Sequence, residues 1–316
     1  MTELLDKTSG RATTFDSLRK RRGWLRLVTL CLLVPLILCA CARRYRVEGL
    51  VLDVSQQQRT IIVSHRAIPG YMGAMAMPFQ VRQARDVLGL QPGDSVEFQL
   101  VVKGRSSHAE KVRVSQRSDV AVEAGQSSLA LPAPKEQLSR GETVPDFELT
   151  DQSHRRARLS DFRSKVVVVN FIYTRCPLPE VCPRLSASFA GLQRRFQRQL
   201  GKNLVLLSIT LDSQHDTPEI LAQYGARWGA DPKGWFLLTG EPSYIERIAA
   251  RFGLIYWPEE GLLTHTSQTA IVGRDGRLAA LIEGFSYEDH QLGDLVARQM
   301  EVTHASHGRD LGSVGQ

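Results

Sequence analysis

Two unbroken apolar runs in the carboxyl-terminal half constrain the fold more than any other feature of this chain. The first run is VVVVNFIY at 166–173, and the second is LVLLSITL at 204–211. Runs of this kind are typical of strands that are buried on both faces of a parallel sheet. Between them, apolar side chains recur at the spacing of an amphipathic helix, at Phe189, Leu192, Phe196 and Leu200. These residues predict a strand–helix–strand unit of an α/β domain.

The elements that follow match the order of the thioredoxin fold, which is strand, helix, strand, then helix, strand, strand and helix. Thr217 is a good capping residue and Pro218 suits the first helical turn, so together they predict the start of a second helix. An Asp-Gly turn at 275–276 lies between two apolar stretches and predicts a hairpin. The remaining elements are expected as a strand over 235–238, a helix over 244–252, strands over 269–272 and 278–282, and a last helix over 288–300.

The chain before this half predicts a separate all-β unit. Several short stretches rich in β-branched residues, separated by turn clusters, favour about five strands over residues 45–115. That number of short strands favours a small closed barrel of the OB type. Residues 116–142 are rich in Ser, Gln, Ala and Pro and are expected to be a linker. The thioredoxin-like domain is then expected over 143–302, with a polar tail at 303–316.

The amino terminus carries the pattern of an export signal. Basic residues at 19–22 precede an uncharged apolar run, LVTLCLLVPLILCACA, at 27–42. The length of this run lies between that of a signal-peptide core and that of a spanning helix. Because basic residues stay on the inner side, we expect residues 1–42 to anchor the chain with the rest facing the periplasm or another extracytoplasmic space. Cys41 follows a short lipobox-like sequence, so a lipid anchor and an uncleaved helix both fit.

The net charge of +7 does not argue for nucleic-acid binding. Residues 1–42 hold seven Lys and Arg against three Asp and Glu, so this segment alone carries +4 of the total. No nucleic-acid partner is therefore expected. The sequence also shows no Gly-rich phosphate-binding loop and no Ser-His-Asp or paired-carboxylate arrangement.

Only two of the five cysteines, Cys176 and Cys182, lie beyond the expected anchor. A disulfide that closes so short a loop would constrain little chain, which favours a redox pair or a metal site over a structural bridge. The two residues stand where the first buried strand gives way to its helix. A helix N-terminus favours thiolates, and a thiolate is both a nucleophile and a ligand for soft metals.

The stretch NFIYTRCPLPEVCP at 170–183 resembles the Sco/SenC family of copper proteins, which deliver copper to the binuclear centre of cytochrome oxidase. The resemblance extends over roughly 141–300 and includes LSITLD at 207–212. It implies that copper, as Cu(I) or Cu(II), is held by Cys176, Cys182 and His265. The family has three residues between its cysteines, whereas this chain has five, so the loop must bulge if both sulfurs are to reach one ion.

The chemistry of the residues adds support for His265 as a ligand, because two thiolates alone leave a soft ion with too few ligands and an imidazole adds a third. A polar loop histidine is the plainer alternative. In the loop after the second apolar run, Asp212 is expected either to orient a ligand or to cap the loop, of which capping is the more common role. His215 is expected to lie on the surface.

A second candidate metal site lies in the β unit. The segment HRAIPGYMGAMAMPF at 65–79 holds three of the five methionines. Met75 and Met77 share one face of a strand, and thioether and imidazole groups are ligands that select Cu(I). Methionines that fill gaps in a core are the alternative, against which the clustering and the neighbouring His65 weigh.

This segment resembles the CusF-like periplasmic copper-binding modules, which are small β-barrels with one His and a Met-x-Met pair. The resemblance implies Cu(I) ligation by His65, Met75 and Met77. That family stacks a Trp on the ion three residues before the first Met of the pair. Met72 stands at this position here, so three thioethers and one imidazole without an aromatic lid are expected.

Two copper-type motifs on one exported chain predict a metallochaperone more than an enzyme. The barrel would capture Cu(I), and the thioredoxin-like domain would pass it to a cytochrome oxidase copper-centre subunit or to another cuproprotein. The alternative is a thiol–disulfide oxidoreductase with Cys176 and Cys182 as its catalytic pair. Such enzymes usually have two residues between their cysteines and do not need His265. Copper storage or sensing is a third alternative.

Overall fold

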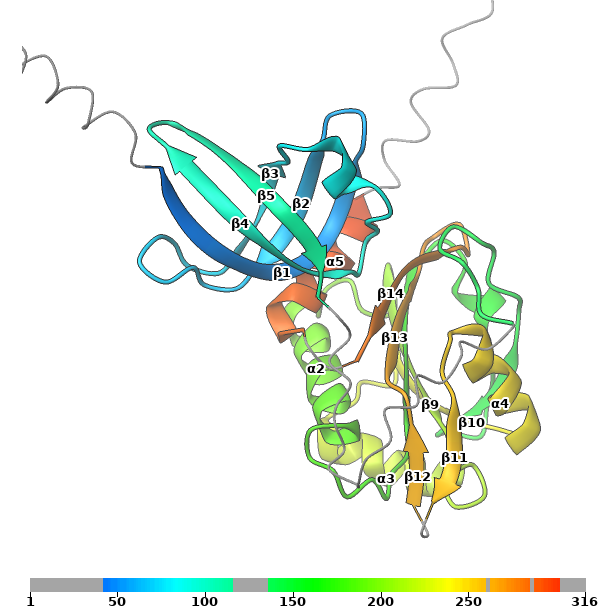
Figure 1. Cartoon of the computed structure of the whole chain (residues 1–316). Helices are drawn as coiled ribbons and strands as arrows, with labels where there is room; N and C mark the ends of the chain where they lie inside the picture. Colours follow the sequence, from blue (N-terminus) through cyan, green and yellow to red (C-terminus); the bar gives the residue numbers. More distant parts are fainter. Residues whose placement is uncertain (1–41, 116–135, 260–261, 285–286, 302–316) are drawn as a thin grey trace, which may run out of the picture. The chain divides into compact units, whose positions relative to one another are not determined.

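The computed structural model describes residues 42–115, 136–259, 262–284 and 287–301 (Figure 1). The predicted anchor, apart from its last residue Ala42, lies outside this range, as does the predicted lipid site at Cys41. Within the described ranges, no helix is both long enough and apolar enough to cross a membrane.

The first unit is a five-stranded sheet in the order β3-β2-β1-β4-β5. A bridge between Val81, just after β3, and Ala109 of β5 brings the two edges of this sheet together, as expected for a small barrel. Buried apolar residues fill the interior, among them Phe79 and Phe98, whose ring centroids lie 4.9 Å apart. The strands are β1 (Arg43–Ser55), β2 (Thr60–His65), β3 (Met75–Gln80), β4 (Ser95–Lys103) and β5 (Ser106–Val114), with a short 3₁₀ helix, η1 (Ala84–Val87), before β4.

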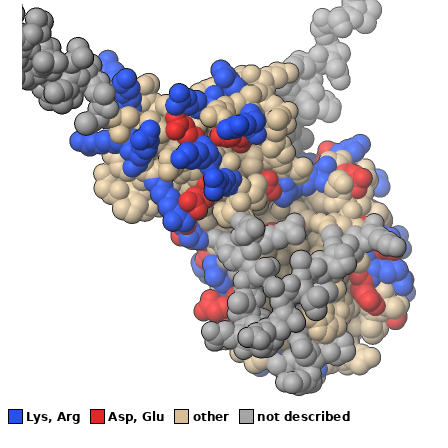
Figure 2. All heavy atoms as spheres, viewed as in Figure 1, with Lys and Arg blue, Asp and Glu red and all other residues tan. Residues whose placement is uncertain are grey.

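Many Lys and Arg side chains lie on the barrel surface, interspersed with Asp and Glu (Figure 2). Arg46 pairs with Glu97 at 2.9 Å, and Arg82 pairs with Glu110 at 2.5 Å. Part of the positive charge of the barrel is therefore balanced by neighbouring carboxylates.

The second unit is built on a seven-stranded sheet in the order β14-β13-β8-β9-β10-β6-β7. Every residue of β8 (Val166–Ile172) and β9 (Leu204–Thr210) is buried, and the two strands pair in parallel, as their apolar runs predict. The other strands are β6 (Glu148–Asp151), β7 (Arg156–Arg158), β10 (Trp235–Thr239), β13 (Gln268–Val272) and β14 (Leu278–Glu283), and a 3₁₀ helix, η2 (Leu159–Phe162), precedes β8.

Helices cover both faces of this sheet (Figure 1). One face packs against three of them through Phe189, Leu221 and Leu292, whereas the other face packs against a single helix through Ile248 and Phe252. The first three are α2 (Cys182–Arg195), α3 (Pro218–Trp228) and α5 (Asp289–Glu301), and the single helix is α4 (Pro242–Arg251). The predicted thioredoxin-like order of strands and helices is confirmed.

One hairpin was not expected from the sequence. Strands β11 (Tyr256–Glu259) and β12 (Leu262–His265) form a separate two-stranded sheet in which His265 lies opposite Tyr256. His265 therefore ends a short strand, whereas the sequence placed it in a loop just before a strand.

Candidate metal centres

The cysteine pair lies between β8 and α2. Cys182 is the first residue of α2 and is fully buried, while Cys176 lies in the preceding loop and is partly exposed. Residues 177–180 between them are all exposed, so the additional residues of this spacing bulge outward. Pro183 occupies the first turn of α2, where a residue without an N–H group loses no hydrogen bond.

The bulge leaves the two thiols in contact. Hydrogen bonds lower the pKa of the Cys176 thiol to about 5; the bond from the Cys182 thiol contributes most, and it outweighs the opposing effect of burial. The same contact raises the pKa of Cys182, and burial raises it further. Near neutral pH, Cys176 is therefore a thiolate and Cys182 keeps the shared proton.

Tyr173 connects the pair to the hairpin that carries His265. This tyrosine is buried, and its hydroxyl is hydrogen-bonded to the Cys176 sulfur and to the backbone of Leu263 in β12. The contact places β12 beside the cysteine loop, two residues before His265. The sequence did not single out Tyr173, although it stands at the end of the first apolar run.

A hollow of about 280 Å³ opens beside the sulfurs. Three of its eight lining residues are aromatic, and the hydroxyl group of one of them, Tyr224, lies 2.8 Å from the Ser186 hydroxyl. The lining residues are Tyr173, Thr174, Cys176, Cys182, Pro183, Tyr224, Arg227 and Trp228. A partner side chain has room to approach the sulfurs here.

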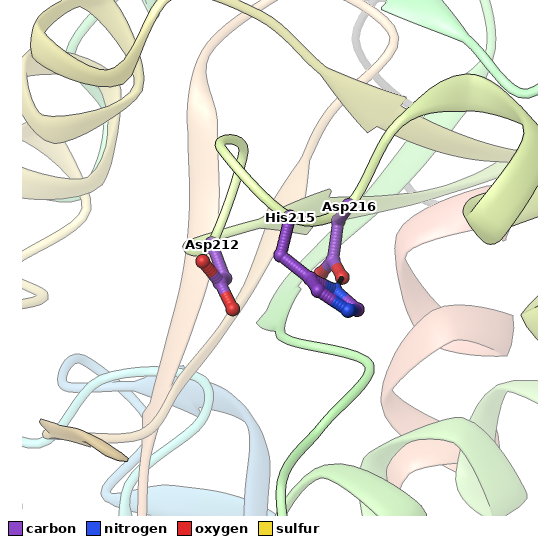
Figure 3. Close-up of side chains that lie close together, drawn as sticks. All are labelled: Asp212, His215 and Asp216. Atoms are coloured by element: carbon purple, nitrogen blue, oxygen red, sulfur yellow. Dashed lines mark hydrogen bonds and ion pairs between the residues drawn. The ribbon is translucent and has the colours of Figure 1, made fainter. Parts of the chain in front are cut away.

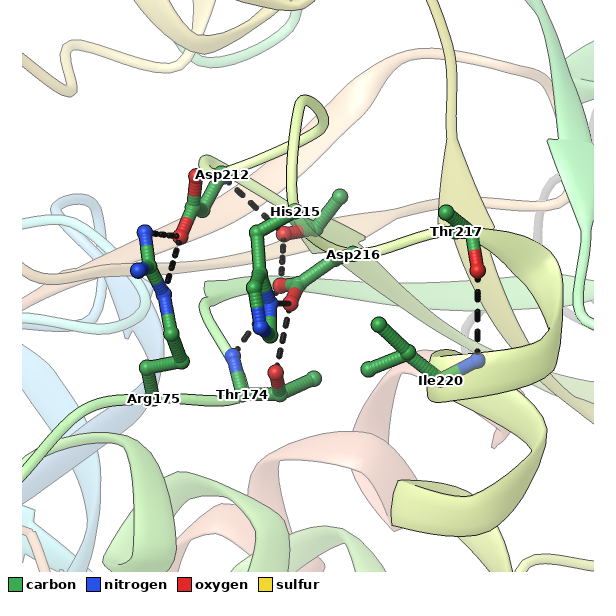
Figure 4. Close-up of polar contacts among 8 residues, drawn as sticks. Thr174, Arg175, Asp212, His215, Asp216, Thr217 and Ile220 are labelled. Carbon is green, nitrogen blue, oxygen red and sulfur yellow. Dashed lines mark hydrogen bonds and ion pairs between the residues drawn. The ribbon is translucent and has the colours of Figure 1, made fainter.

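The loop between β9 and α3 brings together Asp212, His215 and Asp216, whose ligand atoms lie within 4.8 Å of one another (Figure 3). Asp216 is fully buried and accepts hydrogen bonds from the Thr174 and Thr210 hydroxyls, each at 2.5 Å. Asp212 is paired with Arg175 at 2.5 Å (Figure 4). These oxygens already have partners, so the cluster has the character of a hydrogen-bond network rather than of a cation site.

The network adds contacts that the sequence did not predict for this loop. His215 is partly exposed, and its Nδ1 also lies 2.9 Å from the Asp216 carboxylate. The Asp212 side chain binds Arg175, a contact that neither of its two expected roles includes. No role was predicted for Asp216, although its partners Thr210 and His215 are near in the chain; the partner that ties it to the cysteine loop is Thr174.

In the barrel, His65 is fully buried on β2, with its ring edge-on to Phe79 at a centroid distance of 5.7 Å. Its Nδ1 lies 2.7 Å from the Arg66 carbonyl oxygen, which assigns the proton to Nδ1 because a carbonyl can only accept. The lone pair of Nε2 therefore has no partner among the described residues. A buried imidazole fixed in this tautomer with a free nitrogen is the form that binds metal.

The methionines lie on the same face as this imidazole. In the pairing of β2 with β3, Met75 lies directly opposite His65 and Met77 lies opposite Val63. Met77 is half-buried, and Met75 is 48% exposed, so thioether groups stand at the edge of the barrel core. Met72 lies in the loop before β3, where its carbonyl accepts the Ile68 N–H. The donor types suit Cu(I).

A glycine lets β1 approach β2 closely beside His65. Gly49 of β1 lies directly opposite His65, and a Cβ there would lie 2.5 Å from Val63 Cγ1 and 2.6 Å from the Ser64 carbonyl oxygen. Only glycine permits this close approach of the two strands.

Two family models match the chain. Residues 135–300 match the model described as SCO1/SenC, and this match covers more than half of the sequence. The chain belongs to the SCO1/SenC family. Residues 44–113 match the model described as copper binding periplasmic protein CusF. Both resemblances inferred from the sequence are thereby confirmed, and copper is confirmed as the metal at the level of these families.

Curated relatives agree with this assignment. The SCO1 protein homolog of Bacillus subtilis is 27% identical over 139 residues, which cover 43% of this chain and 70% of the relative. The mitochondrial SCO2 homolog of Homo sapiens is 25% identical over 193 residues, covering 56% of this chain and 70% of the relative.

Solved structures of the family are also similar. A SCO1/SenC family lipoprotein from Bacillus anthracis is 24% identical, with a TM-score of 0.47, over 54% of this chain and all of that chain. Arabidopsis thaliana ScoI with copper bound is 22% identical, with a TM-score of 0.44, over 49% of this chain and 96% of that chain.

Proposed function

We propose that this protein is a membrane-anchored extracytoplasmic copper chaperone. Copper is held by Cys176, Cys182 and His265 and is delivered to the copper centre of a respiratory cytochrome oxidase. The observation that carries the proposal is that Cys176 and Cys182 line the same hollow and pack together, despite the five residues between them. Membership of the SCO1/SenC family supports the choice of recipient, and the apolar run at 27–42 supports the anchor.

Copper binding at the cysteine pair displaces one proton. Cys176 is already a thiolate near neutral pH, so only the proton that Cys182 shares with it must leave when the ion binds. Two thiolates and the His265 imidazole then form a three-coordinate site of soft character. The apparent affinity rises with pH through the neutral range, because proton competition at Cys182 weakens.

Delivery proceeds by exchange of ligands. Cys176 is partly exposed beside the hollow, so a ligand of the recipient reaches copper from this side and replaces this thiolate first. Cys182 is buried at the start of α2 and releases the ion last.

The barrel is proposed to bind a second copper ion, as Cu(I). The free and buried Nε2 of His65 supports this site, because an imidazole nitrogen left unpaired in an apolar core destabilises the fold unless it acquires a partner. Met75 and Met77 share its face and supply thioether sulfur, and Met72 is a further thioether from the neighbouring loop.

Thiol–disulfide exchange is the second candidate function. The unequal protonation of the pair favours it, since a partly exposed thiolate next to a buried thiol is typical of an exchange nucleophile and its resolving partner. Cys176 would attack a disulfide of the partner protein and release one partner thiolate. Cys182, after losing its proton, would then attack the Cys176 sulfur, release the second partner thiolate and leave a Cys176–Cys182 disulfide.

A competition titration separates the two functions. The full chain, reduced and free of oxygen, is titrated with Cu(I) against a chromophoric chelator, beside Cys176→Ser, His265→Ala and the double variant Met75→Leu/Met77→Leu. We expect two tight equivalents, of which Cys176→Ser and His265→Ala weaken one and the double methionine variant weakens the other. If Cys176→Ser still binds both equivalents of copper and the dithiol of the parent chain cycles rapidly, the oxidoreductase function is supported and the chaperone function is not.

A further inference from the structure

The position of Cys176 is not explained by the helix that positions Cys182. Cys182 belongs to α2 and is buried among core side chains. Cys176 stands six residues earlier, and the loop that joins it to α2 is exposed throughout residues 177–180. A loop of this kind does not fix a sulfur, because an exposed segment with few contacts orders weakly. The contacts on the other side of Cys176 must do so.

The residue two positions before Cys176 is held by a buried carboxylate. Asp216 accepts a hydrogen bond from the Thr174 N–H at 3.0 Å and another from the Thr174 hydroxyl at 2.5 Å (Figure 4). The same carboxylate accepts from the Thr210 hydroxyl at 2.5 Å, at the end of β9. It therefore ties the start of the cysteine loop to a buried strand of the sheet.

The residue next to Cys176 is held by a second carboxylate. Arg175 donates from Nε and Nη2 to one oxygen of Asp212, at 2.9 and 2.5 Å. This pair is more exposed than Asp216, so screening by solvent makes it the weaker of the two contacts. Both carboxylates belong to the short loop between β9 and α3, and together they fix the backbone just before Cys176.

We propose that Asp216 is a positioning residue for the copper-binding thiolate. It fixes Thr174, and through Thr174 the Cys176 sulfur relative to Cys182, which compensates for the long loop between the two cysteines. The inference rests on the proposed function in so far as the sulfurs hold copper. A carboxylate that accepts several hydrogen bonds restrains its donors more strongly than a single neutral contact would, so Asp216 limits the freedom of the chain at Thr174.

The test uses two variants at this contact and a rescue. Thr174→Val removes the hydroxyl donor at nearly constant shape, Asp216→Asn removes the charge, and Thr174→Ser keeps a hydroxyl. Asp151→Asn is the matched control, because Asp151 is also buried and also holds a turn, accepting from the Ser153 and Arg155 N–H groups at 2.7 and 2.9 Å. That turn lies between β6 and β7, outside the cysteine loop.

The first readout needs no copper. Trypsin cleaves after Arg175 and Arg184 and releases CPLPEVCPR, which carries both thiols and none of the other cysteines. Mass spectrometry of this peptide, after equilibration of the full chain in dithiothreitol buffers and alkylation, gives the dithiol–disulfide equilibrium. The second readout is the rate at which copper leaves the cysteine site to a chelator, followed by the thiolate-to-copper charge-transfer absorption.

We expect Thr174→Val and Asp216→Asn to shift the thiol equilibrium and to speed copper loss, each by roughly tenfold, the equivalent of one lost hydrogen bond to a charged group. Thr174→Ser should stay near the parent values, and Asp151→Asn should change stability without moving either readout.

The inference is overturned if Thr174→Val folds and keeps the parent values in both readouts, or if Asp151→Asn shifts them equally. If Asp216→Asn does not fold, Thr174→Val decides alone. If the parent chain binds no copper at the cysteines, the proposed function is refuted. The dithiol–disulfide equilibrium then still tests whether Asp216 positions Cys176.

Discussion

The unequal protonation of the cysteine pair predicts an unusual pH dependence of alkylation. With its pKa near 5, Cys176 is about 90% thiolate at pH 6, whereas an ordinary cysteine is roughly 0.3% thiolate there. The thiolate of low pKa is also less nucleophilic, by a factor of roughly 40 for a Brønsted slope of 0.4–0.5. The net result is that Cys176 reacts with iodoacetamide roughly tenfold faster than an ordinary thiol at pH 6.

The shape of the profile is more diagnostic than the rate. We expect the rate at Cys176 to stay nearly flat from pH 6 to 9, because the fraction of thiolate hardly changes above the pKa. Cys182 should stay unreactive over this range, since it is buried and keeps its proton. Alkylation of the reduced apo protein, read on the peptide CPLPEVCPR, measures both sites at once.

Removal of the Cys182 thiol should give Cys176 the pH dependence of alkylation that is ordinary for a cysteine. In Cys182→Ala, the pKa of Cys176 rises because the largest of its stabilising contacts is lost. The alkylation rate should then climb about tenfold for each unit of pH below the new pKa. A steep profile in the parent chain, with no change in Cys182→Ala, would refute the contact between the two thiols.

Three further predictions concern the barrel and the anchor. His65→Phe should leave the urea midpoint of the apo protein unchanged or higher, since it removes an unpaired buried nitrogen, while the Cu(I) equivalent of the barrel is lost in the competition titration. Gly49→Ala should lower the free energy of unfolding by about 2 kcal/mol or more, because its Cβ would lie 2.5 Å from Val63 Cγ1; a midpoint equal to that of the parent would contradict the close approach of β1 and β2. Deletion of residues 27–42 should move the protein from the carbonate-washed membrane fraction to the supernatant; a deletion variant that stays in the membrane fraction would place the anchor elsewhere.

The central strands could be predicted from the sequence because long apolar runs indicate strands that are buried on both faces. All residues of β8 and β9 are buried, as such runs require. The hairpin of β11 and β12 carries no such pattern, since Pro258 interrupts the first strand and neither strand alternates. That is why His265 was expected in a loop and was found at the end of a strand.

The ligand types could be predicted, whereas the contacts that arrange them could not. The sequence identified Cys176 and Cys182 but left open whether five intervening residues allow their sulfurs to meet; the outward bulge of the loop decides this. The role of Asp216 could not be predicted, because its partner Thr174 lies 42 residues away in the chain. Contacts between loops at one edge of a sheet leave no periodic signal in either loop.

X-ray absorption at the copper edge identifies the atoms that hold copper in the thioredoxin-like domain. The full chain carrying Met75→Leu/Met77→Leu is loaded with one equivalent of Cu(I), so that the thioredoxin-like domain holds the ion in preference to the weakened barrel site. We expect copper to be coordinated by two sulfurs and one nitrogen. The nitrogen should be lost in His265→Ala, and one sulfur should be lost in Cys176→Ser. A shell without sulfur, or one that is unchanged by Cys176→Ser, would contradict the assignment of this cysteine pair as the copper site.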